Sequence, residues 1–308
     1  MELILHHYPD SSFSEKVRLV LGRKQLAWRS VEIPAYGPKP DYTPLTAGYR
    51  RTPALQVGAD VYCDTRLIVA ELERRAPQPA LYPAAHAARA QVEILVAWAE
   101  TQFFRPLALY VSGLHAARFP AAFHADRASL HGKPTPTLAQ VAAAAQHYLA
   151  QFEPQLAWLE NLLAAEQDFV FGASPSLADF ALYEAPWFLQ RIAGTSPLLA
   201  SLPHTRAWMQ RVAAIGHGEP RTLAARDALA IAAASAPLPC ATSDYRAPEG
   251  VHLGDQVVVA PFDQRAPARG VLAYIDADRI SLAHRTAALD KIAVHFPRLG
   301  YRISRARV

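Results

Sequence analysis

The chain has 308 residues, 51% of them hydrophobic and 19% charged, which suits a folded protein of two or three domains. Its net charge of +4 comes from scattered basic residues that do not alternate with aromatics, which argues against a nucleic-acid partner. The two cysteines, Cys63 and Cys240, form no CxxC pair, which excludes a disulfide framework and a cysteine-based zinc site.

From the sequence pattern we expect neither a membrane-spanning helix nor a signal peptide. No segment approaches the roughly 18 continuous apolar residues that a membrane helix needs, and the apolar run at the start is too short for a signal peptide. We therefore expect a cytoplasmic protein with no membrane partner. The preference for arginine over lysine and the alanine-rich segments indicate a bacterial source.

Residues 1–83 alternate between strand and helix signals. Apolar spacing predicts a helix over 14–23, and a Gly-Ala turn predicts a hairpin that joins strands 53–57 and 60–62. A loop rich in proline, glycine and tyrosine precedes this hairpin. The full predicted order is strand 2–6, helix 14–23, strand 28–33, the hairpin, and a helix that begins at Asp64.

Residues 84–236 are almost entirely helical by pattern. Ser176 and Asp179 form a capping box at the start of one helix. The connection over residues 119–136 is predicted to be a surface loop or a short extra helix. The predicted helices cover residues 87–115, 138–166, 177–192, 205–215 and 221–234.

The composition of residues 237–249 predicts a linker, and the pattern of residues 250–308 predicts short strands. The expected strands are 256–260, 270–275, 279–283, 293–296 and 301–303, which indicates a small β-barrel or curled sheet. The opening HLGDQVVV of this segment resembles that of SH3-like barrels, a resemblance that implies a fold but no function.

Four pieces of sequence occur in an order and spacing that resemble the glutathione transferase family over residues 1–234. They are YPDSSFSEKVR at 8–18, RTPAL at 51–55, Asp64-Thr65, and FVFGASPSLAD at 169–179. The resemblance implies a thioredoxin-like domain at 1–83, an all-helical domain at 84–236, and glutathione as co-substrate. It also implies a homodimer. The β domain at 250–308 is extra to this pattern.

A hydroxyl at the start of the first helix could activate the thiol of glutathione. A thiol with a pKa of about 8.5 is only a few per cent ionised at neutral pH, and lowering that pKa by about two units takes about 2.7 kcal/mol of thiolate stabilisation. An O–H donor and the free N–H groups of a helix start supply such stabilisation. The family's serine-type members use the first serine, so the resemblance assigns this role to Ser11, with Ser12 and Ser14 as alternatives. All three could instead serve only as helix caps.

The other two motifs could hold the peptide part of glutathione. Thr52-Pro53 resembles the family's cis-proline step, where the backbone of Thr52 would pair with the cysteinyl residue; an ordinary trans proline is the alternative. Asp64 and Thr65 could receive the ammonium and carboxylate of the γ-glutamyl group, and Asp64 could also cap its helix. Arg51, or Arg50, lies where a basic residue commonly meets the glycyl carboxylate.

The second substrate is expected between the two domains, in an apolar pocket with a few polar groups. Any single aromatic among the candidates could equally be a core residue. No metal-ligand spacing links His115, His124, His131 and His147, so no metal site is expected. The candidates for this pocket are His7, Tyr36, Trp98, Thr101, Phe104, Arg105 and Tyr110.

These features predict a transferase that adds the glutathione thiolate to a small electrophile. A glutathione-dependent isomerase or dehalogenase is an alternative on the same site, although Phe13 replaces the cysteine of the family's Ser-Ser-Cys isomerases. Ser12 also replaces the proline that follows the serine in many relatives, and the lack of a cysteine there argues against thiol–disulfide exchange. A third alternative is a non-catalytic binding or regulatory protein that meets a protein partner through the β domain.

Overall fold

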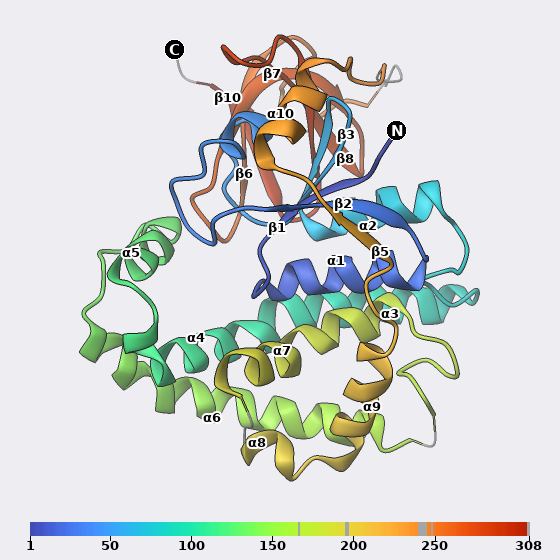
Figure 1. Cartoon of the computed structure of the whole chain (residues 1–308), viewed down its shortest axis with the longest axis vertical. Helices are drawn as coiled ribbons and strands as arrows, with labels where there is room; N and C mark the ends of the chain where they lie inside the picture. The colour runs from blue at the N-terminus through green and yellow to red at the C-terminus, as the bar shows by residue number, and fades with distance from the viewer. Residues whose placement is uncertain (166, 195–196, 240–244, 248, 307–308) are drawn as a thin grey trace.

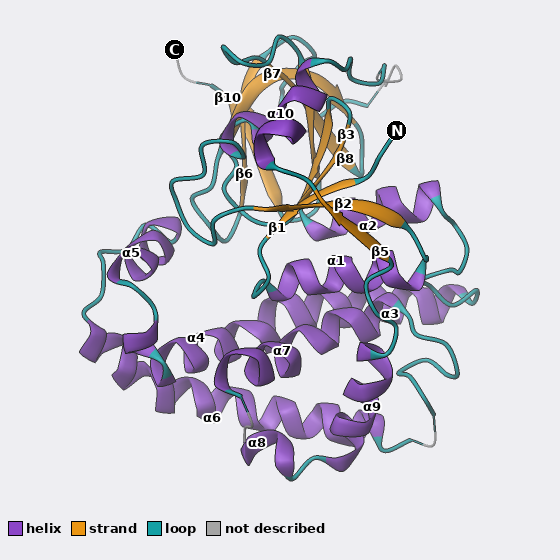
Figure 2. Cartoon of the chain, in the orientation of Figure 1, coloured by secondary structure: helices purple, strands orange, loops and turns teal. Residues whose placement is uncertain are grey.

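The computed structural model describes residues 1–165, 167–194, 197–239, 245–247 and 249–306. In the view of Figure 1 the strands lie in the upper half and most of the helices in the lower half, and Figure 2 shows the same division by colour. The strands of the described residues form one sheet of ten, in the order β10-β6-β7-β8-β9-β4-β3-β1-β2-β5. Cys240 and part of the predicted linker lie outside the described residues.

The first part of the chain builds the centre of this sheet. The predicted β-α-β, β-β-α order is confirmed, with each boundary within two residues of the expected one where a boundary was given. β1 runs parallel to β2 and antiparallel to β3. The elements are β1 (Ile4–His7), α1 (Ser12–Arg23), β2 (Ala27–Glu32), the short η1 (Thr43–Thr46), β3 (Ala54–Val57), β4 (Asp60–Cys63) and α2 (Thr65–Arg75).

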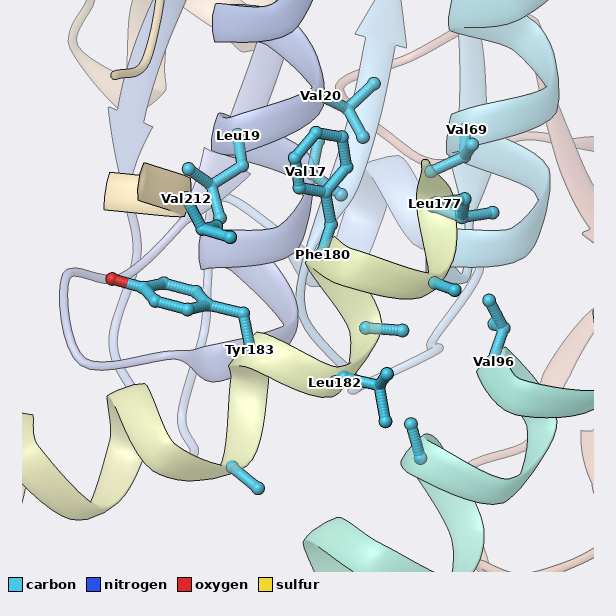
Figure 3. Packing of buried hydrophobic residues seen from close by; sticks show 14 of the residues in the cluster. Val17, Leu19, Val20, Val69, Val96, Leu177, Phe180, Leu182, Tyr183 and Val212 are labelled. Carbon is cyan, nitrogen blue, oxygen red and sulfur yellow. The ribbon is translucent and has the colours of Figure 1, made fainter. Parts of the chain in front are cut away.

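The helical part packs around α7 (Leu177–Ala193). Phe180 of α7 points toward Val17 and Val20 of α1, and Leu177 lies near Val69 of α2 (Figure 3). This contact buries one face of α1 and α2 against the helical part, so a single apolar core joins the two. The other helices here are α3 (His86–Trp98), α4 (Phe104–Leu114), η3 (Ala116–Arg118), α5 (Ala121–Leu130), α6 (Leu138–Leu163), α8 (Pro197–Ala200) and α9 (Pro203–Ala213).

Two predictions for the helical part need refinement. The expected helix over 87–115 is interrupted by a π-helical turn, η2 (Ala99–Phe103), and the connection over 119–136 contains the short helix α5. A π turn adds a residue to the helical repeat, which the apolar spacing alone does not reveal, and such turns are frequent at functional sites.

The predicted helix over 221–234 is wrong at its start. Residues Glu219–Thr222 form β5, which pairs in parallel with β2, and the helix α10 covers only Ala225–Ala233. Gly218 precedes β5 with a φ of 69°, and a Cβ there would lie 2.5 Å from the Leu26 carbonyl oxygen. Only glycine allows this close approach, and pairing with the sheet then overrides the local helical preference.

The five strands expected after residue 250 are confirmed, and they continue the first sheet. Neighbouring strands within this group are antiparallel, whereas β9 pairs in parallel with β4. A second apolar core contains residues of both segments, among them Val61 and Val294. The SH3-like classification stays a prediction. The strands are β6 (Gln256–Pro261), β7 (Ala268–Ile275), β8 (Arg279–His284), β9 (Ile292–Pro297) and β10 (Tyr301–Arg305).

A hydrogen-bonded chain of three buried side chains joins the two segments at β4 and β9. His295 binds Ser281 through Nδ1 at 2.8 Å and Asp60 through Nε2 at 3.0 Å. All three are at most 3% exposed, so no solute can reach them. The chain therefore satisfies buried polar groups at the junction.

In the described parts of the protein, no helix is long and apolar enough to cross a membrane.

Candidate functional site

The register of the central strands brings the sequence motifs to one edge of the sheet. His6 pairs with Ala54 on β3, and Ala54 pairs with Cys63 on β4, both antiparallel. The end of β1, the start of β3 and the end of β4 therefore meet at the same edge. The segments that begin or end there hold Ser11, Thr52-Pro53 and Asp64-Thr65.

Ser11 caps the first helix. It is the N-cap residue of α1, with extended backbone, and its Oγ accepts a hydrogen bond from Ser14 N at 3.2 Å. Ser11 is buried, and so are Ser12 and Ser14 inside the helix. As an acceptor in the cap, the Ser11 hydroxyl keeps its own proton free to donate. This geometry is compatible with both the cap and a thiol contact.

The peptide bond between Thr52 and Pro53 is cis, as the motif predicted. Beside it lies Lys39, which the sequence analysis did not select. The Lys39 ammonium donates to Thr52 Oγ1 at 2.9 Å and to the Arg50 carbonyl at 3.3 Å, and lies 6.0 Å from the Tyr8 ring. These contacts place a cation between the cis bond and the turn that leads to Ser11.

Lys39 is a buried cation without a carboxylate partner. It is 7% exposed, and burial, together with the charge of Arg127, lowers its pKa to about 8. Among the described residues no acidic group forms an ion pair with it, and the nearby Asp126 instead pairs with Arg50. The charged form of a buried ammonium without an ion-pair partner is stabilised when an anion binds next to it.

Asp64 and Thr65 start α2 and are held from two other parts of the chain. Asp64 has a φ of 74°, and its carboxylate accepts from Arg66 N at 3.0 Å and from the Tyr301 hydroxyl of β10 at 2.8 Å. The Thr65 hydroxyl donates to Glu100 in the π turn at 3.4 Å. The predicted anchor therefore touches both the helical part and the C-terminal strands.

Behind Thr65 lies a cluster of two buried side chains, Lys16 and Glu184, and the half-buried Glu100. Lys16 of α1 pairs with Glu100 of η2 and, at 2.9 Å, with Glu184 of α7. Burial raises the pKa of Glu184 above its ordinary value, and the Lys16 charge opposes this rise. Burial also opposes the charged form of Lys16, but the two carboxylates raise its pKa more. The cluster ties α1 to the helical part next to the Thr65 hydroxyl.

Arg51 and Arg50 are both engaged in ion pairs. Arg51 pairs with Asp263, in the loop after β6, at 3.1 Å. Arg50 pairs with Asp126 of α5, whose carboxylate also accepts from Gly37 N at 3.1 Å. Helix α5 and the loop after β6 therefore both hold the loop that precedes the cis-proline bond.

Three half-buried aromatic rings gather next to the start of α1. Phe104 of α4 contacts Phe13 at a centroid distance of 5.1 Å and Phe188 of α7 at 5.6 Å, both edge-on. Phe104 was predicted for the second-substrate pocket. Phe13 was noted only as a departure from the isomerase pattern, and no local sequence signal marks Phe188. Tyr36 contacts Phe123 of α5 and no ring of this cluster among the described residues.

The remaining pocket candidates do not gather with Phe104. His7 is buried and binds Ser30 and Arg18 through its two ring nitrogens. Trp98 stacks on Phe103 at 5.1 Å, and Phe103 in turn stacks on Phe152 of α6. Thr101 and Arg105 are exposed, and Tyr110 is half-buried.

In the described part of the chain, no group of three or more histidine, cysteine or acidic side chains is placed to hold a metal ion. The donor set at the sheet edge is instead hydroxyls, backbone groups, one ammonium and one carboxylate. These groups suit an organic ligand that carries both charges.

Comparisons with known proteins identify the first two parts of the chain. Residues 5–80 match the N-terminal domain of glutathione S-transferases, and residues 70–211 match their C-terminal domain. A GST-like protein from Pseudomonas syringae of known crystal structure is 35% identical, with a TM-score of 0.78, and the match covers 99% of both chains. It therefore spans the C-terminal strands as well.

Two curated proteins also match. FtsZ-localized protein A of Caulobacter vibrioides is 26% identical over 188 residues, which is 59% of this chain and 74% of that protein. Glutathione S-transferase theta-1 of Mus musculus is 30% identical over 171 residues, which is 54% of this chain and 63% of that protein. With both domains matched and the motifs meeting at one sheet edge, the chain belongs to the glutathione S-transferase family.

Proposed function

We propose that this protein binds glutathione at the sheet edge and transfers its thiolate to a small electrophile. The thiol proton leaves to solvent, the sulfur forms a bond to an electrophilic carbon, and a leaving group departs with its electron pair. Ser11 would donate its hydroxyl proton to the thiolate, at a helix start whose N–H groups favour negative charge. Thr52, next to the cis bond, would pair with the cysteinyl backbone.

The observation that carries the proposal is the buried Lys39 ammonium. A cation that is 7% exposed and forms no ion pair with a carboxylate of the described residues fits an anionic ligand, and its contact with Thr52, a residue of the predicted peptide site, supports this. Glutathione is a peptide with a carboxylate at each end. We assign the glycyl carboxylate to Lys39 and not to Arg51, because Arg51 already pairs with Asp263.

The γ-glutamyl end would then bind at Asp64 and Thr65. The Asp64 carboxylate would receive the ammonium, while N–H groups at the start of α2 and the Thr65 hydroxyl would receive the carboxylate. The aromatic cluster of Phe13, Phe104 and Phe188 suits a hydrophobic electrophile, because it lies next to Ser11 and Ser12 and stays partly open.

Calorimetry with glutathione tests the proposal. The wild type is expected to bind at or below millimolar concentration, and Lys39→Met to bind much more weakly. Lys291→Met, at an exposed lysine before β9, is the matched control and should bind like the wild type. Failure of the wild type to bind glutathione would refute every proposed reaction that depends on glutathione.

Product analysis separates the possible reactions. A transferase yields a glutathione conjugate, an isomerase returns glutathione with a rearranged substrate, and a dehalogenase releases halide. We propose the transferase reaction because the serine at the start of α1 supports thiolate attack and Phe13 departs from the isomerase pattern.

A non-catalytic role is the second candidate, and the similarity to FtsZ-localized protein A favours it. In that case glutathione binding would persist without turnover of general electrophiles, and the C-terminal strands would contact a protein partner. We further propose that the protein is a homodimer and lies in the cytoplasm. Sedimentation tests the oligomeric state, and cell fractionation tests the location.

A further inference from the structure

We infer that the C-terminal β segment completes the glutathione site, with Tyr301 as the positioning residue for the Asp64 carboxylate. The inference rests on the proposed glutathione site. It assigns the strands after residue 250 a part in binding the γ-glutamyl ammonium, a part that the thioredoxin-like and helical segments cannot supply alone.

The sheet register brings the C-terminal strands to the edge where Asp64 lies. β9 runs parallel to β4, with Tyr62 opposite His295, so the carboxyl end of β9 lies beside the residue that follows β4. Tyr301 begins β10 and pairs with Pro261 at the end of β6. Only residues 298–300 separate the end of β9 from the start of β10, and the Tyr301–Asp64 and Arg51–Asp263 contacts bring the start of β10 and the loop after β6 to the motifs.

Tyr301 donates directly to the predicted anchor. Its hydroxyl lies 2.8 Å from Asp64 Oδ2, and the Tyr49 hydroxyl lies 2.5 Å from the Tyr301 hydroxyl. Since the Tyr301 proton goes to Asp64, Tyr49 donates to Tyr301. Burial and the charge of Asp64 raise the pKa of Tyr301 well above its ordinary value, so the hydroxyl remains a donor throughout the physiological range.

This chain of donors fixes the carboxylate without saturating it. Asp64 accepts one hydrogen bond on each oxygen, from Arg66 N and from Tyr301. An ionised carboxylate has about four acceptor positions, so capacity remains for an ammonium. With Tyr301 only 4% exposed and Tyr49 only 1%, the hydroxyl chain has little freedom to reorient.

The charge around Asp64 also suits a cation. Arg51 interacts electrostatically with Asp64 and pairs with Asp263 at 3.1 Å. The other arginine that interacts with Asp64, Arg66, is paired with Glu93, so the two carboxylates against the Arg51 guanidinium leave one negative charge in excess. Without Asp263, the Arg51 charge would be free to compete with the ligand ammonium for Asp64.

Tyr301→Phe is the direct test, and Tyr274→Phe is its matched control. Tyr274 lies in the same segment and donates to Asp276, away from the site. Calorimetry uses glutathione and its desamino analogue, glutaryl-cysteinylglycine, which lacks only the ammonium. We expect Tyr301→Phe to weaken glutathione binding by about tenfold, the equivalent of one hydrogen bond to a charged group, and to leave the affinity for the analogue unchanged.

A steady-state assay gives a second readout. Tyr301→Phe is expected to raise the KM for glutathione while kcat with chlorodinitrobenzene stays within about twofold, because the hydrogen bond acts on a remote binding group. Equal weakening of both ligands, unchanged glutathione affinity or tighter binding would each overturn the inference. Tyr274→Phe should match the wild type with both ligands.

A second variant covers the case in which Tyr301→Phe fails to fold. Asp263 is about half exposed, so Asp263→Asn should fold, and Asp255→Asn, at another acidic residue paired with an arginine of the segment, is its control. We expect Asp263→Asn to weaken glutathione and spare the analogue. If the wild type does not bind glutathione, the proposed function fails. If the wild type binds and Asp64→Asn weakens binding while both segment variants behave as wild type, only the present inference fails.

Discussion

Replacement of Lys39 by methionine should stabilise the free protein and weaken its glutathione site. The side chain is 7% exposed, and its pKa is lowered from 10.5 to about 8. At about 1.4 kcal/mol for each tenfold change in a proton equilibrium, the charged ammonium costs the folded protein about 3 kcal/mol at neutral pH. The variant also loses the hydrogen bonds from Lys39 to Thr52 and to the Arg50 carbonyl, and this loss offsets part of the stability gained by removing the buried charge. We therefore expect a net gain of about 1–2 kcal/mol for Lys39→Met.

The pH dependence of this gain has a defined sign. Below pH 8 Lys39 is protonated in both the folded and unfolded states, so its cost to the folded state is constant. Between about pH 8 and 10.5 the folded protein has lost the proton that the unfolded chain still holds. The wild type therefore gains stability relative to Lys39→Met as pH rises through this window, and urea unfolding at pH 7 and pH 10 measures the difference.

The effect on binding has the opposite direction. A hydrogen bond between an ammonium and a carboxylate is worth about 1.5–3 kcal/mol, so Lys39→Met should weaken binding about 10- to 150-fold. S-methylglutathione removes the thiol titration from the calorimetric measurement. The wild type should bind it less tightly above pH 8, whereas Lys39→Arg, which stays charged, should lose less affinity. A methionine variant with unchanged affinity and unchanged stability would refute both the burial argument and the assigned carboxylate.

Three further predictions concern Ser11, Glu184 and the buried chain at the β4–β9 junction. Ser11→Ala should raise the pKa of the bound thiol, read from thiolate absorbance, and lower turnover by about a hundredfold with little change in glutathione affinity; unchanged turnover would remove its role. A raised folded-state pKa makes the wild type lose stability as pH rises from 4.5 to about 7, so Glu184→Gln should flatten that slope in urea unfolding, and an equal slope would contradict it. His295→Ala should cost about 2–4 kcal/mol, more than Ser281→Ala, because it removes the partner of Ser281 and leaves the Asp60 carboxylate with only the Leu238 N–H; equal unfolding midpoints would contradict this.

Most of the fold follows from local sequence signals. Helical and strand periodicities depend on neighbours along the chain, so the five C-terminal strands and the β-α-β, β-β-α order could be predicted. The join between β9 and β4 could not, because its partners lie more than two hundred residues apart and no periodicity says which sheet edge a strand will choose. The same holds for β5, whose last two residues fall in the predicted helix over 221–234. The pairing of β5 with β2 depends on the folded sheet and leaves no local sequence signal.

The candidate site divides in the same way. Ser11, Thr52 and Asp64 belong to short motifs, and the strand register gathers them. The only local feature of Lys39 is its position between two prolines, and this feature does not predict that its side chain is buried. Tyr301 contacts Asp64 from 237 positions away, a contact that only the folded sheet produces.

A crystal structure of the protein soaked with glutathione would show every proposed contact at once. We expect the sulfur within hydrogen-bond distance of Ser11 Oγ, the glycyl carboxylate on Lys39 Nζ, and the γ-glutamyl ammonium on Asp64. Glutathione bound elsewhere, or a sheet edge left empty at millimolar glutathione, would contradict it.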